Sequence, residues 1–409
     1  MGRSPRWTVG VDEVDLGDPR CFGGGWQADV WREARRVHPV AWTESLHAGG
    51  FWSVTSHRLG RQVLTQPRTF ISGHGMRLGA REAGVRTASG RMLVVSDGQQ
   101  HQALRSVHSA WFSADVVSSL QPLIDYMIDE LVCDALSCGG VIDAVTELAF
   151  KIPTGVLFQI MSVPEEGRGE LARLTTAAFD DAEQTASAAA ARTQAHAQIF
   201  GYFVELADER ERCPGQDIVT ALLQGTVNGR PLSPDEVILN CDGLLNGGLE
   251  TTPQAISGAI LAFAKHEEVL QRIKENPDLL DVAVEEILRW TSPPMHAMRT
   301  AVADTRVGAA SIRAGDRVVV WLTSCNWDEE VFAHADQFIV DRRPNPHLSF
   351  GAGPHYCVGA ALARAELRSF VAAMIRRVSS VQVVGPVVRQ RSNFMNGLTR
   401  LDVKLTAEP

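Results

Sequence analysis

The chemistry that this chain can support centres on one cysteine in a glycine-rich run. Cys357 stands in FGAGPHYCVG (residues 350–359), and a helical pattern follows it directly. Because glycine lacks Cβ, the backbone of such a run can turn sharply and approach a flat ligand closely. The start of a helix offers backbone N–H groups and the positive end of a dipole, which favour a thiolate. A thiolate held in a tight loop is a suitable axial ligand for the iron of a porphyrin.

A second unusual stretch lies inside a long helical pattern. Ser233, Pro234 and Glu236 form the N-cap, first position and capping box of a helix start, and the pattern continues to about Lys265. The run GGLETTP (residues 247–253) interrupts it. Each glycine costs about 1 kcal/mol in a helix interior, and proline cannot donate its hydrogen bond. We therefore expect a kink that opens a groove and frees backbone carbonyls, which is typical of a functional site.

These two runs resemble the signature motifs of the cytochrome P-450 superfamily. The family's haem-binding pattern, Phe-Gly-x-Gly-x-His-x-Cys-x-Gly, is present at every specified position in residues 350–359. Residues 247–252 match its oxygen-activation pattern, (Ala/Gly)-Gly-x-(Asp/Glu)-Thr-(Thr/Ser). The resemblance implies a haem b cofactor (iron protoporphyrin IX) with Cys357 as the ligand of the metal. It also implies that Thr251 and Glu250 are catalytic, through a hydrogen bond to dioxygen and a proton relay.

The resemblance also assigns further haem contacts and a structural network. His101 and Arg105, at i and i+4 on one helical face, match the family's His-x-x-x-Arg pattern for the haem propionates. The other cofactor-binding residues that it implies are Phe350, Gly351, His355 and Gly359 in the cysteine run, Gly248 in the long helix, and Arg299. A triad of Glu286, Arg289 and Arg342 is implied as structural, supporting the haem loop without taking part in catalysis.

The elements that must position these residues are mostly helical. Strand patterns are short and peripheral, so we expect a mainly α fold with small peripheral β-sheets. The resemblance implies the family's prism fold, with a long central helix over the haem. Helices are predicted over 186–206, over 282–290 and after Cys357, and hairpins over 40–54 and 307–321. No linker divides the chain, so we expect a single haem domain over 1–409, with 1–20 as an irregular N-terminal segment.

Composition excludes several classes of function. A net charge of −9 and a pI near 5.8, without a basic stripe, argue against nucleic acid as a partner. The N-terminus lacks the apolar core of a signal peptide, and no window is apolar enough to span a membrane. The seven cysteines are odd in number and contain no Cys-x-x-Cys, which disfavours disulfides and zinc sites. We expect a cytoplasmic protein that binds no membrane.

The resemblance places four segments over the distal face of the haem: 72–94, 243–247, 294–298 and 393–398. The candidate substrate-binding residues in them are Asn246, Met295, His296, Phe394 and Asn396. Unpaired buried amides cost free energy, so a purely hydrocarbon substrate would not suit them. We expect a small, partly polar organic substrate with an aromatic or apolar body, such as a peptide-derived or indole metabolite.

The leading hypothesis is a haem-thiolate monooxygenase of specialised, natural-product metabolism. It would use dioxygen and two electrons from a separate ferredoxin and its ferredoxin reductase, since the chain ends without a flavin or iron–sulfur domain. Arg364 and Arg368 are candidate docking residues for that donor. The main alternative is oxidative coupling or ring closure of an aromatic, indole or cyclic dipeptide substrate without oxygen insertion. A peroxide-driven enzyme is a further alternative, and a haem-binding sensor or docking module is the alternative of another class.

Overall fold

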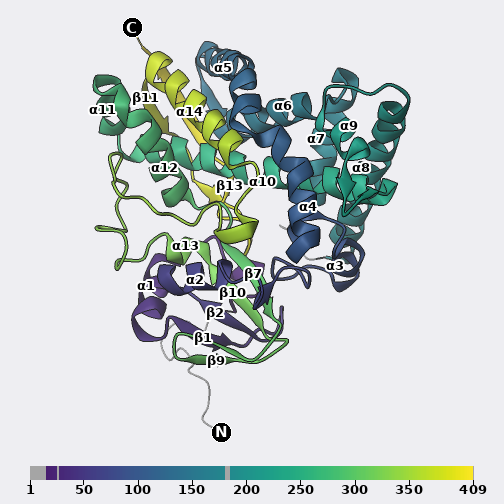
Figure 1. Ribbon diagram of the computed structural model, residues 1–409. Coiled ribbons are helices and arrows are strands. Elements are labelled where there is room, and N and C mark those ends of the chain that lie inside the picture. Colours follow the sequence, from purple (N-terminus) through teal and green to yellow (C-terminus); the bar gives the residue numbers. More distant parts are fainter. Residues whose placement is uncertain (1–14, 25–26, 180–184, 409) are drawn as a thin grey trace.

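The computed structural model describes residues 15–24, 27–179 and 185–408, and helices form most of it (Figure 1). The helices are α1 (Gln27–Val37), α2 (His57–Leu64), α3 (Glu82–Ala88), α4 (Gly98–Ser109), α5 (Ala114–Ser137), α6 (Lys151–Ile160), α7 (Glu165–Phe179), α8 (Ala186–Arg212), α9 (Ile218–Gln224), α10 (Pro234–Lys265), α11 (Glu268–Glu275), α12 (Leu280–Thr291), α13 (Leu322–Cys325) and α14 (Ala360–Arg377). The predicted irregular segment 1–20 lies mostly outside the described residues; its described end contains one 3-10 turn, Pro19–Cys21.

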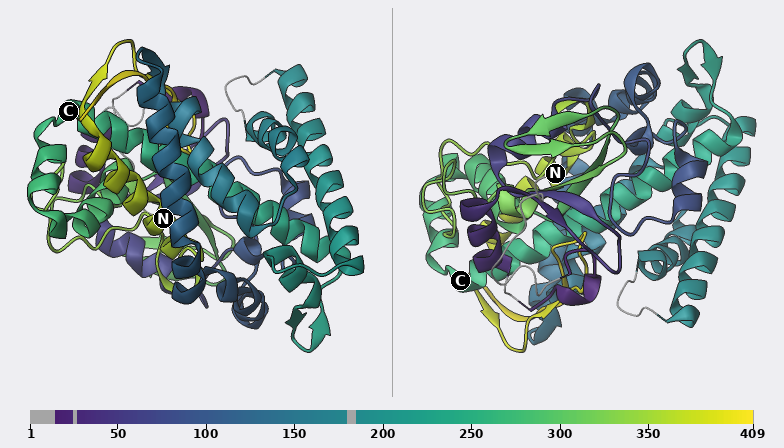
Figure 2. Two further views of the ribbon diagram at one scale, coloured as in Figure 1. Left: turned by 90° about the horizontal axis from the view of Figure 1, so that it is seen from above. Right: turned by 90° about the horizontal axis from the view of Figure 1, so that it is seen from below.

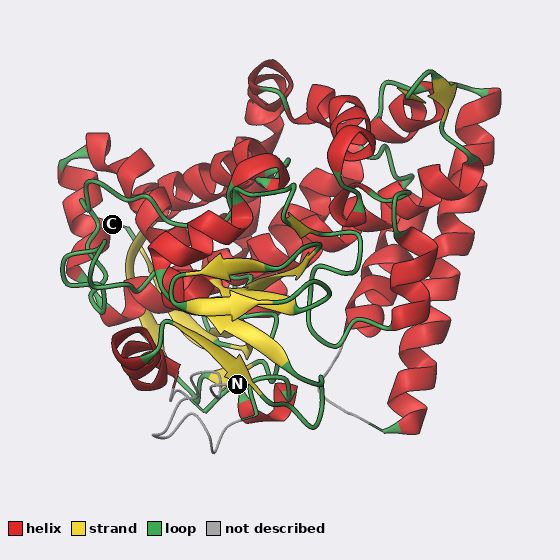
Figure 3. Cartoon of the chain, turned by 60° about the horizontal axis from the view of Figure 1, so that its bottom comes forward, coloured by secondary structure: helices red, strands yellow, loops and turns green. Residues whose placement is uncertain are grey.

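The strands form one larger sheet, in the lower half of Figure 1 and the middle of Figure 3, and several small sheets elsewhere. They are β1 (Val40–Thr43), β2 (Phe51–Val54), β3 (Phe70–Ile71), β4 (Val141–Asp143), β5 (Thr226–Val227), β6 (Arg230–Pro231), β7 (His296–Ala301), β8 (Thr305–Val307), β9 (Ala310–Ile312), β10 (Arg317–Trp321), β11 (Val378–Val383), β12 (Val388–Arg389), β13 (Leu398–Arg400) and β14 (Asp402–Ala407). The largest sheet has the order β1-β2-β10-β7-β3, in which only the β2–β10 pairing is parallel. The expected mainly α fold with small peripheral sheets is confirmed.

The long helix α10 runs through the helical part and carries the interrupted motif. Ser233 and Glu236 form the predicted capping box at its start, and the helix ends at Lys265 as expected. It stays helical through Pro253. The hydroxyl of Thr251 donates to the carbonyl of Gly247 at 2.8 Å, one turn earlier in the same helix. The motif is therefore accommodated within a continuous helix.

One apolar core joins most helices around α10. It includes fully buried residues of α5, α6, α12 and α14, and the view from above in Figure 2 shows α14 lying beside α5. A second cluster packs the large sheet against α2, and a third surrounds Trp31 and Trp321. These three clusters form the apolar interior of the helical part and of the large sheet.

Most predicted elements are present, and one is paired differently. The hairpin over 40–54 is β1–β2, and the helices over 186–206 and 282–290 are α8 and α12. In the region 307–321 the hairpin is β8–β9, whereas β10 pairs with β2 and β7 in the large sheet. The reason is burial: Val318–Trp321 are all buried, as befits a central strand. In the described ranges, no helix is both long and apolar enough to cross a membrane.

Candidate active site

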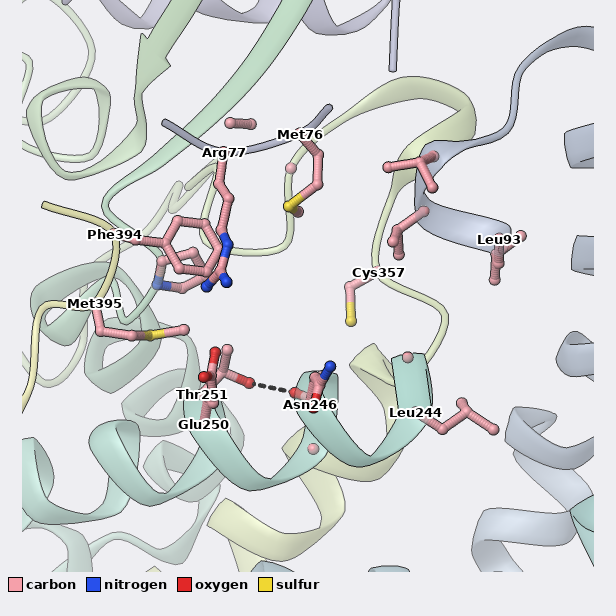
Figure 4. A pocket seen from close by; sticks show the side chains of 18 of the residues that line it. Met76, Arg77, Leu93, Leu244, Asn246, Glu250, Thr251, Cys357, Phe394 and Met395 are labelled. Atoms are coloured by element: carbon pink, nitrogen blue, oxygen red, sulfur yellow. Dashed lines mark hydrogen bonds between the residues drawn. The ribbon is translucent and has the colours of Figure 1, made fainter. Parts of the chain in front are cut away.

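A cavity of about 860 Å³ separates α10 from the cysteine run (Figure 4). Segments far apart in sequence form its walls, including α10, the loop before α3, the inner face of α8, β7 and the loop before β13. Fourteen of the predicted site residues line it: His101, Arg105, Asn246, Gly248, Glu250, Thr251, His296, Arg299, Phe350, Gly351, His355, Cys357, Gly359 and Phe394. The two motifs recognised in the sequence therefore face one shared space, with Cys357 on the wall opposite Thr251.

The cysteine run is a tight turn that leads into α14. Gly351 and Gly353 have φ values of 70° and 72°, which favour glycine strongly. A Cβ on Gly353 would lie 2.5 Å from the carbonyl oxygen of Leu64, so no side chain fits there without backbone movement. The amide of Cys357 donates to the carbonyl of Phe350 at 2.9 Å, which closes the turn and presents the thiol to the cavity.

The surroundings of Cys357 act on its thiol in opposite directions, and the N–H of Gly359 at the start of α14 favours the thiolate as expected. Desolvation raises the pKa of the Cys357 thiol, and this outweighs the N–H of Gly359 and the positive charges of Arg105 and Arg364, which act to lower it. The physical reason is that a partial dipole charge compensates less than the loss of water costs. A coordinated cation would reverse the balance, because a thiol bound to a metal ion is deprotonated.

A cluster of basic side chains lies beside the thiol. The rings of His101 and His355 have centroids 4.1 Å apart, and Nε2 of His355 is 3.5 Å from Oδ1 of Asp97. Arg299 is 5% exposed; its Nη1 donates to the carbonyl of Met298, and no described carboxylate lies within ion-pair distance of it. Desolvation lowers the pKa of Arg299 to about 10 and that of His101 to about 4.

These basic groups fit the acidic edge of a haem. Within the described ranges, Nε2 of His101 is buried without a hydrogen-bond partner, and Arg299 is a buried cation that no carboxylate contacts, although the charge of Asp97 acts on it from a distance. Buried cations and unpaired donors cost free energy unless a partner reaches them. Two carboxylates, as haem carries, would supply such partners. The thiol, the basic cluster and the cavity between them are thus consistent with the cofactor that the sequence motifs imply.

The opposite wall is formed by one face of α10. Glu250 and Thr251 both line the cavity, so the helix presents the predicted acid and hydroxyl to the same space as Cys357. The two glycines before them differ. A Cβ on Gly248 would lie 3.1 Å from Cδ2 of Leu157, whereas one on Gly247 would meet nothing within 4 Å. Gly248, predicted to contact the cofactor, lines the cavity and also allows Leu157 of α6 to approach closely, and Gly247 lines the cavity beside it.

Glu286, Arg289 and Arg342 meet as predicted, away from the cavity. Nε and Nη2 of Arg289 donate to the two carboxylate oxygens of Glu286, each at 2.8 Å, and Nε of Arg342 donates at 3.0 Å. The backbone of Ile339 and the amide of Asn345 complete the shell around the carboxylate. Remaining guanidinium donors reach backbone carbonyls in 326–337. The network ties α12 to the loop that precedes the cysteine run.

Two of the five predicted substrate residues do not line the cavity. Met295 is buried in the sheet-side core, and the amide of Asn396 donates to the carbonyl of Thr291 at 2.6 Å. His296 lines the cavity, but its nitrogens are occupied by the amide of Leu78 and the carbonyl of Asn393. Asn246 and Phe394 remain exposed to the cavity as predicted. Sequence neighbourhood indicated the right segments but not which way each side chain points.

Three cavity residues escaped the sequence analysis. Arg77 lies over the ring of Phe394, 5.5 Å from its centroid (Figure 4). Asp242 is 6% exposed, and desolvation raises its pKa to about 7. Glu366 on α14 is 3% exposed; desolvation raises its pKa to about 8, and its Oε2 has no partner. For Asp242 and Glu366, the sequence signal was a single carboxylate on the apolar face of a predicted helix.

Arg364 and Arg368, the candidate docking residues, are both paired with acids of α12. Arg364 donates twice to Glu285, at 2.6 and 2.9 Å, and lies over the ring of Phe350. Arg368 donates to Asp281 at 2.8 Å. Neither side chain is therefore an unpaired surface cation, and Arg364 instead braces the cysteine run.

Known proteins resemble this chain along nearly its whole length. A family model described as Cytochrome P450 matches residues 187–399. The chain is 32% identical to Cytochrome P450 NovI of Streptomyces niveus, over 97% of both chains, and 31% identical to Linalool 8-monooxygenase of Pseudomonas putida, over 97% of this chain and 99% of the other. Among solved structures, P450 OxyD, involved in the biosynthesis of vancomycin-type antibiotics, has a TM-score of 0.88 and 34% identity, over 97% of this chain and all of that one.

Proposed function

Because this chain belongs to the cytochrome P450 family of haem monooxygenases, we propose that it oxidises a small organic substrate of natural-product metabolism with dioxygen and two electrons. The observation that carries the proposal is the shared cavity, which has the thiol of Cys357 on one wall and Glu250 with Thr251 on the other. The similarity to a protein of vancomycin-type antibiotic biosynthesis supports a role in natural-product metabolism. We further propose that residues 1–409 form one haem domain.

Different residues around the cavity would hold different parts of the cofactor. We assign the iron ligand to Cys357 and the cofactor to haem b. Arg299, His101, Arg105 and His355 would hold the propionates, because they offer buried positive charge and an unpaired donor. Phe350, Gly351 and Gly359 shape the turn that carries the thiol. When bound, the haem supplies the redox chemistry that activates dioxygen and oxidises the substrate.

The face of α10 that lines the cavity would deliver protons and limit the access of water. Thr251 already donates its hydrogen to the carbonyl of Gly247, so its oxygen is oriented to accept a hydrogen bond from the cavity side. Glu250 can carry a proton towards the same space. Apolar side chains elsewhere in the lining limit the water that reaches it. Asn246 and Phe394 would orient the substrate beside this pair.

We place the protein in the cytoplasm and assign its electrons to a separate ferredoxin and ferredoxin reductase. The absence of disulfides among the described cysteines is compatible with a reducing compartment. Arg364 and Arg368 are paired with Glu285 and Asp281, so neither is assigned to the surface that docks the ferredoxin.

The first test uses the purified holoprotein and its Cys357→Ser variant. The wild type should give the ferrous carbonyl Soret band of thiolate-ligated haem, and the variant should lose both that band and substrate oxidation. Cys138→Ser, which changes an exposed cysteine, is the matched control and should change neither. A variant that keeps the band would show that another residue holds the iron.

The second test identifies the reaction. A ferric Soret titration against indoles, cyclic dipeptides, macrolides, terpenes and fatty acids selects ligands for turnover with ferredoxin, ferredoxin reductase and isotopically labelled dioxygen. Label in the product supports oxygen insertion, as proposed. A product that has lost two hydrogens and carries no label would favour the coupling or ring-closing alternative. Turnover with peroxide that equals turnover with the electron donors would contradict the proposed use of dioxygen.

A further inference from the structure

One arginine of the cavity has a guanidinium without a hydrogen-bond or ion-pair partner among the described residues. Arg77 lies in the loop between β3 and α3, and Figure 4 shows its guanidinium pointing from that loop into the cavity. In the described ranges, no oxygen accepts a hydrogen bond from it and no carboxylate lies within ion-pair distance. Arg77 is half-buried, and none of the fully buried nitrogens that lack partners belongs to it. Its N–H groups are therefore accessible to a ligand in the cavity.

The ring of Phe394 supports this side chain without satisfying its donors. The guanidinium carbon of Arg77 lies 5.5 Å from the ring centroid. A ring face attracts the positive charge. A guanidinium also has five N–H donors, which bind oxygen acceptors and charged groups most strongly. Met76 and Met395 line the cavity on the same side in Figure 4, so this part of the wall combines one cation with apolar surface.

The lining of the cavity carries an excess of positive charge. Among the described residues, five arginines line it: Arg77, Arg81, Arg105, Arg192 and Arg299. Two of these, Arg105 and Arg299, are assigned above to the haem propionates. Of the acids in the lining, desolvation raises the pKa of Asp242 to about 7 and that of Glu366 to about 8, so both are at least half protonated at pH 7. The part of the cavity left for a substrate therefore favours an anion.

The remaining positive charge lies between the loop before α3 and the face of α8. Arg81 donates to the hydroxyl of Thr193 on α8 at 2.8 Å. Desolvation lowers the pKa of His196, one turn along that helix, and the charges of Arg77 and Arg81 lower it further. From α10, the carboxylate of Asp242 is influenced by Arg77 but accepts its hydrogen bond from Asn246. The groups packed around Arg77 thus do not neutralise it.

Resting on the proposed function, we propose that Arg77 binds a carboxylate group of the substrate. A planar guanidinium can donate two parallel hydrogen bonds to the two oxygens of a carboxylate. A carboxylate fits better than a phosphate, because one guanidinium balances a single charge and a second desolvated charge would be costly. The apolar or aromatic body of the substrate then packs beside Phe394 and extends towards Thr251, which lines the same cavity (Figure 4).

The test compares acids with their neutral amides on the ferric holoprotein. The probes are 3-phenylpropionate, indole-3-propionate and nonanoate and the primary carboxamide of each, with affinity measured by calorimetry. Each acid should bind roughly 10- to 100-fold more tightly than its amide, the range expected for hydrogen bonds between charged groups. Phenyl phosphate that binds more tightly than 3-phenylpropionate would overturn the assignment to a carboxylate. Spectra of the same samples show whether an acid binds the iron directly, and iron ligation that accounts for the whole preference would also overturn it.

Three variants localise the effect. Arg77→Met removes the guanidinium and keeps a long side chain, so the preference for the acid should disappear while the affinity for the amide stays unchanged. Arg77→Gln keeps an N–H donor without the charge, and it serves as the second test if Arg77→Met does not fold. Arg86→Met is the control, because Arg86 on α3 is exposed, pairs with Glu82 and lies outside the cavity lining. It should alter neither affinity.

The outcomes separate this inference from the proposed function. Normal haem loading and a normal ferrous carbonyl spectrum, with no preference for acids in the wild type, would overturn the carboxylate site alone. A preference that survives in Arg77→Met or Arg77→Gln would also overturn it, as would an equal loss in Arg86→Met. Failure of the wild type to bind haem through Cys357 would instead refute the proposed function.

Discussion

Two buried carboxylates on neighbouring helices have opposite surroundings. Glu286 on α12 is fully buried and accepts hydrogen bonds from two guanidinium groups, one backbone amide and one side-chain amide. Asp242 on α10 is nearly as buried, yet it has one amide contact, and its buried Oδ1 has no hydrogen-bond partner among the described residues. The same chemical group is thus fully satisfied in one region and left unsatisfied in the other.

The difference separates structure from ligand recognition. Both carboxylate oxygens of Glu286 are paired within the chain, so this carboxylate has no free oxygen with which to bind a ligand. Among the described residues, buried polar atoms without partners line the cavity at His101, Asp242, Asn246 and Glu366, whereas those of Thr323 and Asn345 lie away from it. Because unpaired buried groups are costly, their concentration around one cavity indicates where ligands complete the structure.

Removing the carboxylate of Glu286 should give the largest effect on the free energy of unfolding. Glu286→Ala leaves two buried guanidinium groups without their shared carboxylate, so we expect a loss of about 3–5 kcal/mol in the free energy of unfolding. Urea unfolding of the holoprotein measures it. Asp281→Ala changes an exposed residue of the same helix α12 and breaks its ion pair with Arg368 of α14, which should cost at most about 1 kcal/mol. Equal losses in both variants would erase the distinction between the two regions.

Substitution of Thr251 in the cavity wall should affect turnover and not the free energy of unfolding. Thr251→Ala should reduce the yield of oxidised product per dioxygen consumed, by roughly 100-fold if proton delivery depends on its hydroxyl. Thr251→Ser keeps the hydroxyl and should restore most of the yield. Dioxygen consumption, product and peroxide are measured together, and unchanged coupling in the alanine variant would refute the assignment of Thr251.

The basic cluster should affect cofactor retention. Arg299→Leu removes a buried cation that no described carboxylate contacts, so the apoprotein should fold at least as well as the wild type. Haem affinity should nevertheless fall by roughly 10-fold, because a charged hydrogen-bond donor to a propionate is lost. Haem transfer to an acceptor protein measures this. Arg313→Leu, at the turn before β10, is the control, and an equal loss there would show that position 299 has no special role.

The smallest predicted effects are changes in the free energy of unfolding on substitution of Glu236 and of Asp242. Both residues lie on α10, and the two changes should have opposite signs. Arg230 and Ser233 hold the pKa of Glu236 near 2, so its stabilisation is present above its ordinary pKa and is lost as pH falls through 2. Glu236→Gln should therefore lower stability by about 1–2 kcal/mol at pH 7, with the difference shrinking below about pH 4.5.

For Asp242, desolvation raises the folded pKa to about 7, so the wild type loses stability as pH rises from its ordinary pKa towards 7. Asp242→Asn should be more stable than the wild type at pH 8, and the advantage should shrink as pH falls to 5. Urea unfolding at several pH values measures both variants. The same sign in both would contradict the assigned difference in their surroundings.

The motifs and the long helix could be predicted because their information is local. A capping box, a glycine-rich turn before a helix, and an i,i+3 pair such as Glu286 and Arg289 all depend on near neighbours along the chain. Strand pairing was harder: residues 317–321 pair with strands from both halves of the sequence, which hydrophobic patterning does not reveal. Side-chain direction failed in the loops, where Asn396 donates to a carbonyl outside the cavity.

The sequence by itself determined the family, the position of the thiol and the acid–hydroxyl pair on one helix, because each is encoded within a few residues. Only the tertiary structure decided which polar groups remain without partners. Partners such as those of Glu286 come from segments about 50 residues away, and the absence of a partner at Asp242 depends on every element packed around it. Burial and pairing are properties of the packed chain, and they set the chemistry that the cavity can recognise.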